Sequence, residues 1–414
     1  MHASQPWPYF TGLLGGIGGR IKLRPDDFRV TELPLYNPSG RGTHIYFGLQ
    51  KRGLSTPAAI ERVARRLGVP PGRFGAAGLK DTQALTEQAV SVEHLDDGQL
   101  ATLEALGDDR IRVTWVSRHG NKLKPGHLAG NRFAIRIRDV GAEQLPACRQ
   151  VLEVLAQRGV PNYFGEQRFG RRGDNDRLGS ALVRGELDGF IRLLLGEPRD
   201  VDPPDCRRAR ELFQAGRLEE AQKAWPYSYR NERKALAAWI RTGGAARASF
   251  AAVDKFHKRL VVSAFQSLLY NRVLARRIDG IDTVLLGDLA QKTDTGGVFL
   301  VEDLAAEQPR AQAFAISPTG PLFGYRVSLA QGVPGQIERE VLAEAGLASE
   351  DWRRPGAHKV KGMRRPLRFA LKDPQAEAGA DEHGPYIEVR FTAAPGCFAT
   401  VALREIMKAD LPEA

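Results

Sequence analysis

Strand-like and helix-like patterns occupy different parts of this 414-residue chain, and this separation constrains the fold more than any other feature. Residues 20–140 and 366–392 contain segments in which apolar and polar residues alternate, as in strands with one buried face. Between them, residues 176–277 are dominated by helical spacing, with the strongest run at 250–278. A sheet-rich start and end around a helix-rich middle predict an α+β fold in which one domain interrupts another.

The individual elements can be placed from the same patterns. We expect a helix over 56–67, with Thr56 as its cap and Pro57 in its first turn. A final helix is expected over 399–408. Residues 374–384 and 199–205 are the best candidates for disorder. The expected strands are 20–33, 43–49, 88–92, 110–116, 132–140, 366–371 and 386–392.

The charge of the chain favours a polyanionic partner. Lys and Arg number 60 against 49 Asp and Glu, a formal net charge of +11, which suits either nucleic acid or an acidic membrane surface. The apolar stretches are far shorter than the roughly 20 residues of a spanning helix. Residues 1–10 do not resemble a signal peptide, and the three cysteines lie far apart, as suits a reducing cytoplasm. We therefore expect a cytoplasmic protein that is not bound to a membrane.

The common catalytic signatures are missing from the sequence. It contains no Gly-Lys dipeptide and hence no Walker A loop, and no Gly-x-Ser-x-Gly elbow. The glycine-rich run 15–20 is followed by Ile21 where a dinucleotide fingerprint needs glycine. No pair of histidines has zinc-ligand spacing. These observations disfavour a bound metal, a nucleotide cofactor and a serine nucleophile.

The segment 77–88, Ala-Gly-Leu-Lys-Asp-Thr-Gln-Ala-Leu-Thr-Glu-Gln, carries the most distinctive chemistry. Gly78 allows a sharp turn or a close approach, and the side chains of Lys80 and Asp81 are expected to diverge. Taken alone, Asp81 would be interpreted as a turn or helix-capping aspartate.

This segment resembles the signature of the TruD family of tRNA pseudouridine synthases, a Gly-x-Lys-Asp core followed by Ala-x-Thr-x-Gln. Other family motifs are matched in order along the chain, which makes a chance match negligible. They are Lys22 with Pro25-Asp-Asp-Phe28, Asn131-Arg-Phe133, the string Val160-Pro-Asn-Tyr-Phe-Gly-Glu-Gln-Arg-Phe-Gly170, Ser263-Ala-Phe-Gln-Ser-Leu-Leu-Tyr-Asn271, and Pro395-Gly-Cys-Phe-Ala-Thr400 with Arg404-Glu405. Residues 185–246 resemble only the longer members of the family.

The resemblance implies a fold and an activity. The fold would be a pseudouridine synthase catalytic domain with a mixed or antiparallel sheet, formed by residues 1–158 and 372–414. An inserted α+β domain, residues 159–371, would make a two-lobed molecule with an RNA-binding cleft. The activity would be isomerisation of a uridine in tRNA, most often at position 13 and in some relatives at position 35, without cofactor or metal. A monomer is expected. The alternatives are a catalytically silent RNA-binding protein and another RNA enzyme, such as a methyltransferase.

The resemblance also implies roles for residues. Asp81 would be the catalytic carboxylate, either a nucleophile at C1′ or a base at the 2′ position of the ribose. Lys22 would lie beside it and favour its charged form. The aromatic walls of the uracil pocket would be Phe28, Phe133 and Phe398, and the amide of Asn131 would hold the edge of the base.

Three basic clusters flank the motif segments and are candidate phosphate contacts, although any such cluster can equally be a solvated face. The first precedes Asn131, the second overlaps the string at 160–170, and the third lies near the second domain junction. Their members are Arg118, Lys122 and Lys124; Arg168, Arg171 and Arg172; and Arg364, Arg365 and Arg368.

Overall fold

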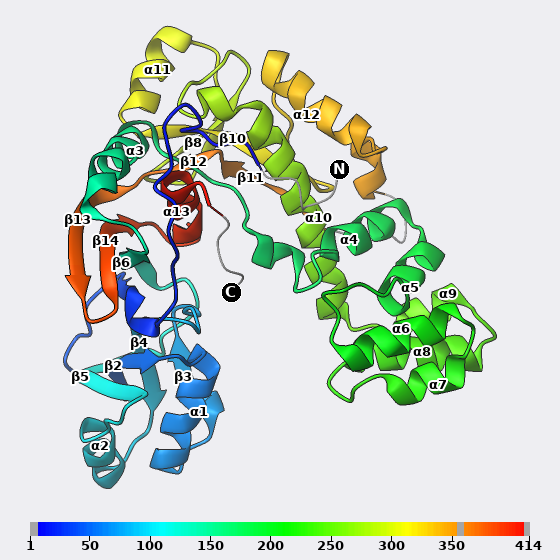
Figure 1. Cartoon of the computed structure of the whole chain (residues 1–414), viewed down its shortest axis with the longest axis horizontal. Coiled ribbons are helices and arrows are strands. Elements are labelled where there is room, and N and C mark those ends of the chain that lie inside the picture. Colours follow the sequence, from blue (N-terminus) through cyan, green and yellow to red (C-terminus); the bar gives the residue numbers. More distant parts are fainter. Residues whose placement is uncertain (1–6, 354–359, 410–414) are drawn as a thin grey trace. The chain divides into compact units, whose positions relative to one another are not determined.

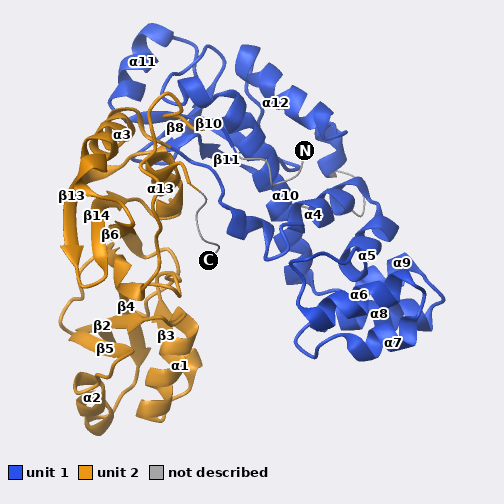
Figure 2. Cartoon of the chain, in the orientation of Figure 1, with its two compact units in different colours: residues 1–8, 161–368 blue, residues 9–160, 369–414 orange. Residues whose placement is uncertain are grey.

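The structure is a computed structural model that describes residues 7–353 and 360–409, and it divides into two compact units (Figure 2). Unit 1 consists of Met1–Pro8 and Pro161–Arg368, and unit 2 of Tyr9–Val160 and Phe369–Ala414. The sequence predicts domain boundaries at 158/159 and 371/372, and the two compact units divide at 160/161 and 368/369.

Unit 2 is built on a mixed eight-stranded sheet whose order is β13-β14-β6-β1-β4-β2-β5, with β3 also paired to β4. The pairing of β1 with β4 is parallel, and the other pairings described for this sheet are antiparallel. In Figure 1 the C-terminal strands β13 and β14 lie beside β6. The strands are β1 (Phe28–Pro34), β2 (His44–Arg52), β3 (Phe74–Ala76), β4 (Leu85–Glu93), β5 (Ile111–His119), β6 (Leu128–Arg138), β13 (Lys372–Asp381) and β14 (Gly384–Ala393).

Helix α1 covers part of one face of this sheet. Its apolar stripe, which includes Val63 and Leu67, packs in one buried cluster with Phe47 of β2 and Val90 of β4. Helix α3 contacts β13 and α13. The helical segments of unit 2 are η1 (Pro25–Asp27), α1 (Thr56–Leu67), η2 (Pro71–Arg73), α2 (Asp97–Glu104), η3 (Ala142–Gln144), α3 (Leu145–Arg158) and α13 (Ala399–Met407).

Two expectations for the start of unit 2 were wrong in detail. The strand expected over 20–33 begins only at Phe28, because Pro25 opens a 3-10 turn and Lys22 has a left-handed backbone with φ of 58°. The cap of α1 is Ser55, whose hydroxyl accepts a hydrogen bond from the backbone N–H of Ala58 at 3.3 Å. Thr56 is instead the first helical residue, and its hydroxyl has another role described below.

The disorder candidate at 374–384 is also wrong, because most of it is strand β13, paired along its length with β14. Pro374, which cannot donate a hydrogen bond, lies where the register shifts between Lys372 and Gln375. Small residues such as Ala376 and Ala378 fill this strand, so it lacks the large apolar alternation by which strands are found in sequences.

Unit 1 combines helices with a four-stranded sheet of order β11-β10-β8-β9. The expected helical run at 250–278 is divided at Val253 and Asp254, and the carboxylate of Asp254 caps the second helix through Phe256 N at 2.7 Å. The elements of unit 1 are η4 (Glu166–Phe169), α4 (Asn175–Arg184), α5 (Leu187–Leu195), α6 (Pro204–Gln214), α7 (Leu218–Ala224), α8 (Arg230–Arg241), α9 (Ala246–Ala252), α10 (Lys255–Arg276), η5 (Ile278–Gly280), β8 (Leu289–Lys292), β9 (Val298–Leu300), α11 (Leu304–Gln312), β10 (Ile316–Leu322), α12 (Gly332–Glu344), η6 (Ser349–Arg353) and β11 (Met363–Pro366). The short strands β7 (Val160–Pro161) and β12 (Arg368–Phe369) pair with each other where the chain passes from one unit to the other.

Within residues 7–353 and 360–409, none of the helices combines the length and the apolar character that crossing a membrane requires. Over the same residues, His, Cys, Asp and Glu side chains form no group of three or more that could hold a metal ion.

Candidate active site

The segment that carries Asp81 is fixed to the sheet by a chain of hydrogen bonds. Thr56 donates its hydroxyl proton to Gln88 Oε1 at 2.8 Å and accepts the backbone N–H of Lys80 at 3.0 Å. Gln88 Nε2 in turn donates to the carbonyl of Gly78 at 3.0 Å. Because Thr56 and Gln88 are each about 1–2% exposed, water cannot replace these bonds at little cost. The Gly78–Asp81 backbone is therefore held in one conformation by α1 and β4.

The Asp81 carboxylate has defined partners on both oxygens. Oδ2 forms an ion pair with Lys22 Nζ, and Oδ1 accepts the backbone N–H of Gln83 at 2.9 Å. The Asp81 side chain keeps 21% of its surface exposed, whereas that of Lys22 keeps 1%. The carboxylate is thus accessible to a substrate while its counter-ion is buried.

Lys22 reaches Asp81 from the N-terminal segment of unit 2. Its ammonium also lies 4.8 Å from the ring centroid of Phe28, a cation–π contact. The segment leading to Lys22 is tied to α13, since Phe10 N and Thr11 N donate to the two carboxylate oxygens of Glu405 at 3.0 and 2.9 Å. Glu405 is fully buried. The position of Lys22 therefore depends on the C-terminal helix.

Two further lysines surround Asp81, and as expected Lys80 points elsewhere. Lys80 forms a buried ion pair with Glu32, while Lys51 Nζ donates to the backbone carbonyl of Asp81 at 2.7 Å. Burial lowers the pKa of Lys51 to about 8, against the opposing effect of the Asp81 charge. Sequence reasoning missed Lys51 and Glu32. Each looks like an ordinary polar strand residue. The only signal of their burial is that Lys51 lies two residues after the buried Leu49 and Glu32 two residues after the buried Val30, which places each on the buried face of its strand.

Sheet register explains why these groups share one face. Directly opposed residues point to the same side of a sheet. Lys51 pairs with Thr86, and Thr86 with Val30; across the next two strands, Val30 pairs with Phe133 and Phe133 with Phe391. This row crosses five strands, from Lys51 beside the Asp81 backbone to Phe391 on β14, and its side chains lie buried on one face of the sheet.

The aromatic and amide residues expected for the uracil pocket lie on this same face. Phe28 contacts Phe133 edge-to-face with ring centroids 6.5 Å apart, and Phe133 packs on Phe391 at 5.2 Å. Asn131, two residues before Phe133 on β6, points to the same side. Its Oδ1 is buried and accepts no hydrogen bond from any residue that the structure describes, as is also true of the Thr86 hydroxyl. Buried polar atoms without a partner are uncommon in folded proteins.

The sequence model of the tRNA pseudouridine synthase D (TruD) family matches residues 7–406. The chain belongs to the TruD family. A tRNA pseudouridine synthase D from Geobacter metallireducens is 43% identical over 405 residues, which cover 98% of each chain. One from Syntrophotalea carbinolica is 42% identical over 403 residues, 97% of this chain and 99% of the relative. A solved structure from Methanosarcina mazei, described as a candidate TruD, aligns with a TM-score of 0.86 at 29% identity and covers 97% of this chain and 96% of its own.

Membership in the TruD family and the structural match confirm the recognition and the α+β pseudouridine synthase fold expected from the sequence. The residue roles carried over from the family stay predictions. The structure brings Lys22, Phe28, Asn131, Phe133 and Asp81 together on one unit, as just described. Phe398 is the residue preceding α13 and is 38% exposed, so its place against the uracil stays a prediction as well.

Five of the arginines proposed as TruD RNA contacts have internal partners in unit 1. Arg364 is buried in an ion pair with Glu338, and Arg368 is 2% exposed. The other three are half-buried: Arg172 pairs with Asp174 and Asp202, Arg168 donates to Ser267 and Ser263, and Arg365 lies over the ring of Phe164 at 4.3 Å.

These contacts hold segments of unit 1 together. The Arg168 bonds join the string at 160–170 to α10, and Asn271 adds to this by accepting from Phe164 N at 2.9 Å. Burial lowers the pKa of Arg168. A cation already committed to internal acceptors is a weak candidate for phosphate binding, because it would have to break those bonds.

The remaining basic candidates lie closer to solvent. Arg118 on β5, Lys124 and Arg171 are exposed, and Lys122 is partly exposed and donates to the carbonyl of Gly72 at 2.8 Å. Charge in the sequence could not separate these from the buried arginines, because burial depends on contacts between distant segments.

Proposed function

We propose that this protein converts a uridine of tRNA to pseudouridine, with Asp81 as the essential carboxylate. The observation that carries the proposal is the accessible Asp81 carboxylate, which pairs with the buried Lys22 ammonium on the same unit as Phe133 and Asn131; the Oδ1 atom of Asn131 has no hydrogen-bond partner among the described residues. Its relatives are named tRNA pseudouridine synthase D.

The reaction explains why a carboxylate and a neighbouring ammonium group are needed. The uracil must leave C1′ through nitrogen and return through C5, so the ribose needs a partner while the base turns. Asp81, ionised beside Lys22, can attack C1′ and hold the sugar covalently, or can remove the 2′ proton to give a glycal. In both routes the carboxylate is restored at the end, and the base loses its C5 proton as the new bond is completed.

The aromatic and amide groups suit the base that turns. Phe28 and Phe133 offer apolar walls for a uracil removed from its stack. The Asn131 amide can exchange hydrogen bonds with the base edge, and this would satisfy the buried Oδ1 that the described residues leave without a partner. Apolar walls that contact only the faces of the uracil leave it free to rotate in its plane, which the exchange of N1 for C5 requires.

We further propose position 13 as the target, by resemblance to the family, and a monomer in the cytoplasm as the working form. The three cysteines, which form no disulfide, agree with a reducing compartment. Mapping of pseudouridine by carbodiimide labelling and primer extension tests the position, and light scattering tests the monomer.

The central test is tritium release from unmodified tRNA transcripts labelled at uracil C5. Asp81→Asn keeps the size of the side chain and one hydrogen-bond acceptor but removes its charge, so we expect release to fall to background while tRNA binding persists. Asp109→Asn, the same change at an exposed aspartate of unit 2, controls for the substitution itself. Release by Asp81→Asn at the wild-type rate would refute the role of the carboxylate.

Two alternative functions can be tested with the same transcripts. A silent RNA-binding protein would bind the transcripts and release no tritium even as wild type. A methyltransferase would bind S-adenosylmethionine, which equilibrium dialysis detects directly.

A further inference from the structure

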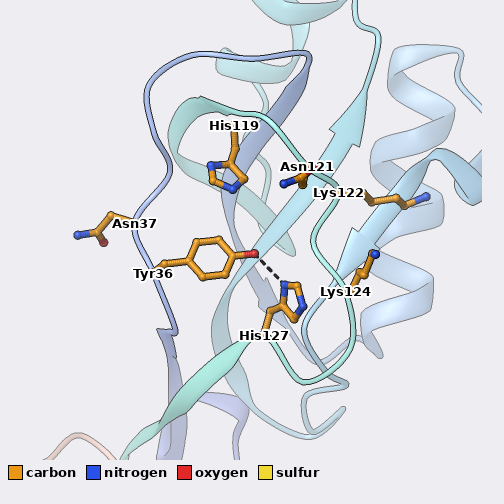
Figure 3. A pocket seen from close by; sticks show the side chains of 7 residues that line it. All are labelled: Tyr36, Asn37, His119, Asn121, Lys122, Lys124 and His127. Carbon is orange, nitrogen blue, oxygen red and sulfur yellow. Dashed lines mark hydrogen bonds between the residues drawn. The ribbon is translucent and has the colours of Figure 1, made fainter.

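A second pocket of unit 2 has the chemistry of a nucleotide site and lies apart from Asp81. Its cavity is about 480 Å³, within the range of roughly 300–1,000 Å³ common for ligand sites. Three aromatic rings, two amides and two ammonium groups line it, and none of these seven residues is acidic. They are Tyr36, Asn37, His119, Asn121, Lys122, Lys124 and His127 (Figure 3).

The aromatic part of this pocket is pre-organised. The Tyr36 ring stacks on His119 with centroids 5.3 Å apart and an interplanar angle of 24°. Its hydroxyl lies 2.8 Å from His127 Nδ1. His119 is fixed in turn, because Nδ1 accepts the backbone N–H of Ser39 at 3.2 Å and its ring packs edge-to-face on the buried Tyr46 at 5.0 Å. A ligand that stacks here has few side chains to immobilise, which favours binding.

The two lysines, Lys122 and Lys124, line the side of the pocket opposite the Tyr36 backbone (Figure 3). Lys122 Nζ is bonded to the carbonyl of Gly72 at 2.8 Å and Lys124 is exposed. Aromatic rings beside ammonium groups match an unpaired nucleotide, whose base stacks while its phosphate binds the cations.

Sheet geometry separates this pocket from the face that carries Asp81. Tyr46 and Phe47 are neighbours on β2 and so point to opposite faces. Phe47 shares its face with Lys51, which bonds to Asp81, whereas Tyr46 contacts the pocket residue His119. A nucleotide in this pocket is therefore a different one from the uridine that reacts.

The two faces are nevertheless joined by the chain. Gly126, in the loop that lines the pocket, donates its N–H to the carbonyl of Ala77 at 2.8 Å, four residues before Asp81. The same loop lies directly on Gly75, where a Cβ atom would meet the carbonyl oxygen of Leu123 at 2.3 Å. The loop thus packs on the segment that ends at Asp81, so the pocket is linked to that segment through the backbone.

We propose that this pocket binds an unpaired nucleotide of the RNA substrate, with its base stacked on Tyr36 and the histidines and its phosphate on the exposed Lys124. The inference rests on the proposed function, and it adds a recognition subsite outside the uracil pocket. It predicts that the RNA must present a second single-stranded nucleotide in addition to the target uridine.

The test compares Tyr36→Ala with Tyr36→Phe, using fluorescence anisotropy with the unmodified tRNA transcripts of the activity assay. Loss of one stacking ring should weaken binding about tenfold or more, whereas the phenyl ring of Tyr36→Phe should keep the affinity within about threefold. The KM for pseudouridine formation should rise with the Kd, and kcat should not change. An unchanged Kd for folded Tyr36→Ala would overturn the proposal.

Two measurements keep the proposal testable if Tyr36→Ala does not fold. Transcripts containing 4-thiouridine should cross-link to peptides that hold Tyr36 or residues 119–127 of the wild-type protein, and cross-links confined to other segments would overturn the proposal. Lys124→Ala should flatten the salt dependence of binding more than Lys372→Ala, an exposed lysine on β13. Equal slopes would count against the phosphate contact.

Competition identifies the occupant and separates this proposal from the proposed function. Single-stranded oligonucleotides should displace the transcript better than duplex RNA. If free uridine monophosphate competes as well as an oligonucleotide, the pocket is a small-ligand site and the proposal fails. Pseudouridine formation with normal binding by Tyr36→Ala would refute the subsite alone. Tyr36-dependent binding without pseudouridine would refute the proposed function alone.

Discussion

Replacing Glu405 by Gln should loosen the N-terminal segment that delivers Lys22 to Asp81. The Glu405 carboxylate is fully buried and accepts hydrogen bonds from Phe10 N, Thr11 N and the Thr11 hydroxyl at 3.0, 2.9 and 2.7 Å. Glutamine keeps one acceptor oxygen, but its amide nitrogen cannot accept, so at least one buried or partly buried donor loses its partner.

The size of the effect follows from these bonds. A hydrogen bond to a charged group contributes about 1.5–3 kcal/mol, and an orphaned buried donor costs a similar amount, so we expect a loss of about 2–4 kcal/mol. For a domain of this size that corresponds to a fall in Tm of roughly 4–16 °C, at about 2–4 °C per kcal/mol. Because Lys22 follows the same segment, kcat for pseudouridine formation should fall as well.

The assay combines thermal unfolding with hydrogen exchange of the peptides covering residues 9–22. Exchange there should accelerate, whereas the strands around β4 should stay protected. Glu61→Gln, the same change at an exposed position of α1, is the control and should leave both unchanged. A Glu405→Gln protein with the Tm and exchange of wild type would refute this account of how Lys22 is held.

The remaining predictions concern charged groups of unit 2. Lys22→Met removes the counter-ion of Asp81, and the rate constant of single-turnover tritium release should fall about 10- to 100-fold, the effect of losing about 1.5–3 kcal/mol. A rate constant within twofold of wild type would contradict this. Burial lowers the pKa of Lys51 to about 8 in the folded protein, so between pH 8 and about 10.5 the unfolded chain binds more protons than the folded one. The free energy of unfolding should therefore rise with pH over this range. Urea titrations at several pH values should show this rise for the wild type and not for Lys51→Met. The Arg138 guanidinium holds the pKa of Asp381 below its usual range. The resulting stabilisation of the folded protein is complete above about pH 4 and is lost on further acidification, so the free energy of unfolding should depend less on acid pH in Asp381→Asn than in the wild type. Equal dependence in both proteins would refute the coupling.

The sequence predicts best where structure is local. Helix α1 occupies the expected residues because its stripe and Pro57 act within a few turns, and the divergence of Lys80 and Asp81 follows from adjacent positions on one backbone. The candidate carboxylate itself was found only through resemblance, since a lone Asp after Gly-Leu-Lys is an ordinary turn residue.

What the sequence could not reveal depends on contacts between distant segments. Lys51 and Glu32 enter the site because the sheet register buries them, and the neighbouring apolar residues indicate only which face of the strand they lie on, not the partners they meet there. Arg364 looked like a surface cation, yet Glu338 and Thr319 enclose it. Strand β13 was mistaken for a disordered segment because its neighbour β14, not its own composition, makes it a strand.

The connectivity of unit 2 has a consequence for synthesis of the chain on the ribosome. Strand β6 ends at Arg138 and its partner β14 begins at Gly384, so the whole of α4–α12 is translated between them. Until β14 emerges, one edge of β6 has no partner, and an open edge invites pairing with other chains. The helices of unit 1, which are rich in local contacts, can fold during this interval, whereas the sheet of unit 2 is completed only after β14 has been synthesised. Translation that stops short of Gly384 would therefore leave a protein prone to aggregation, with its sheet unfinished beside the very strand that carries Asn131 and Phe133.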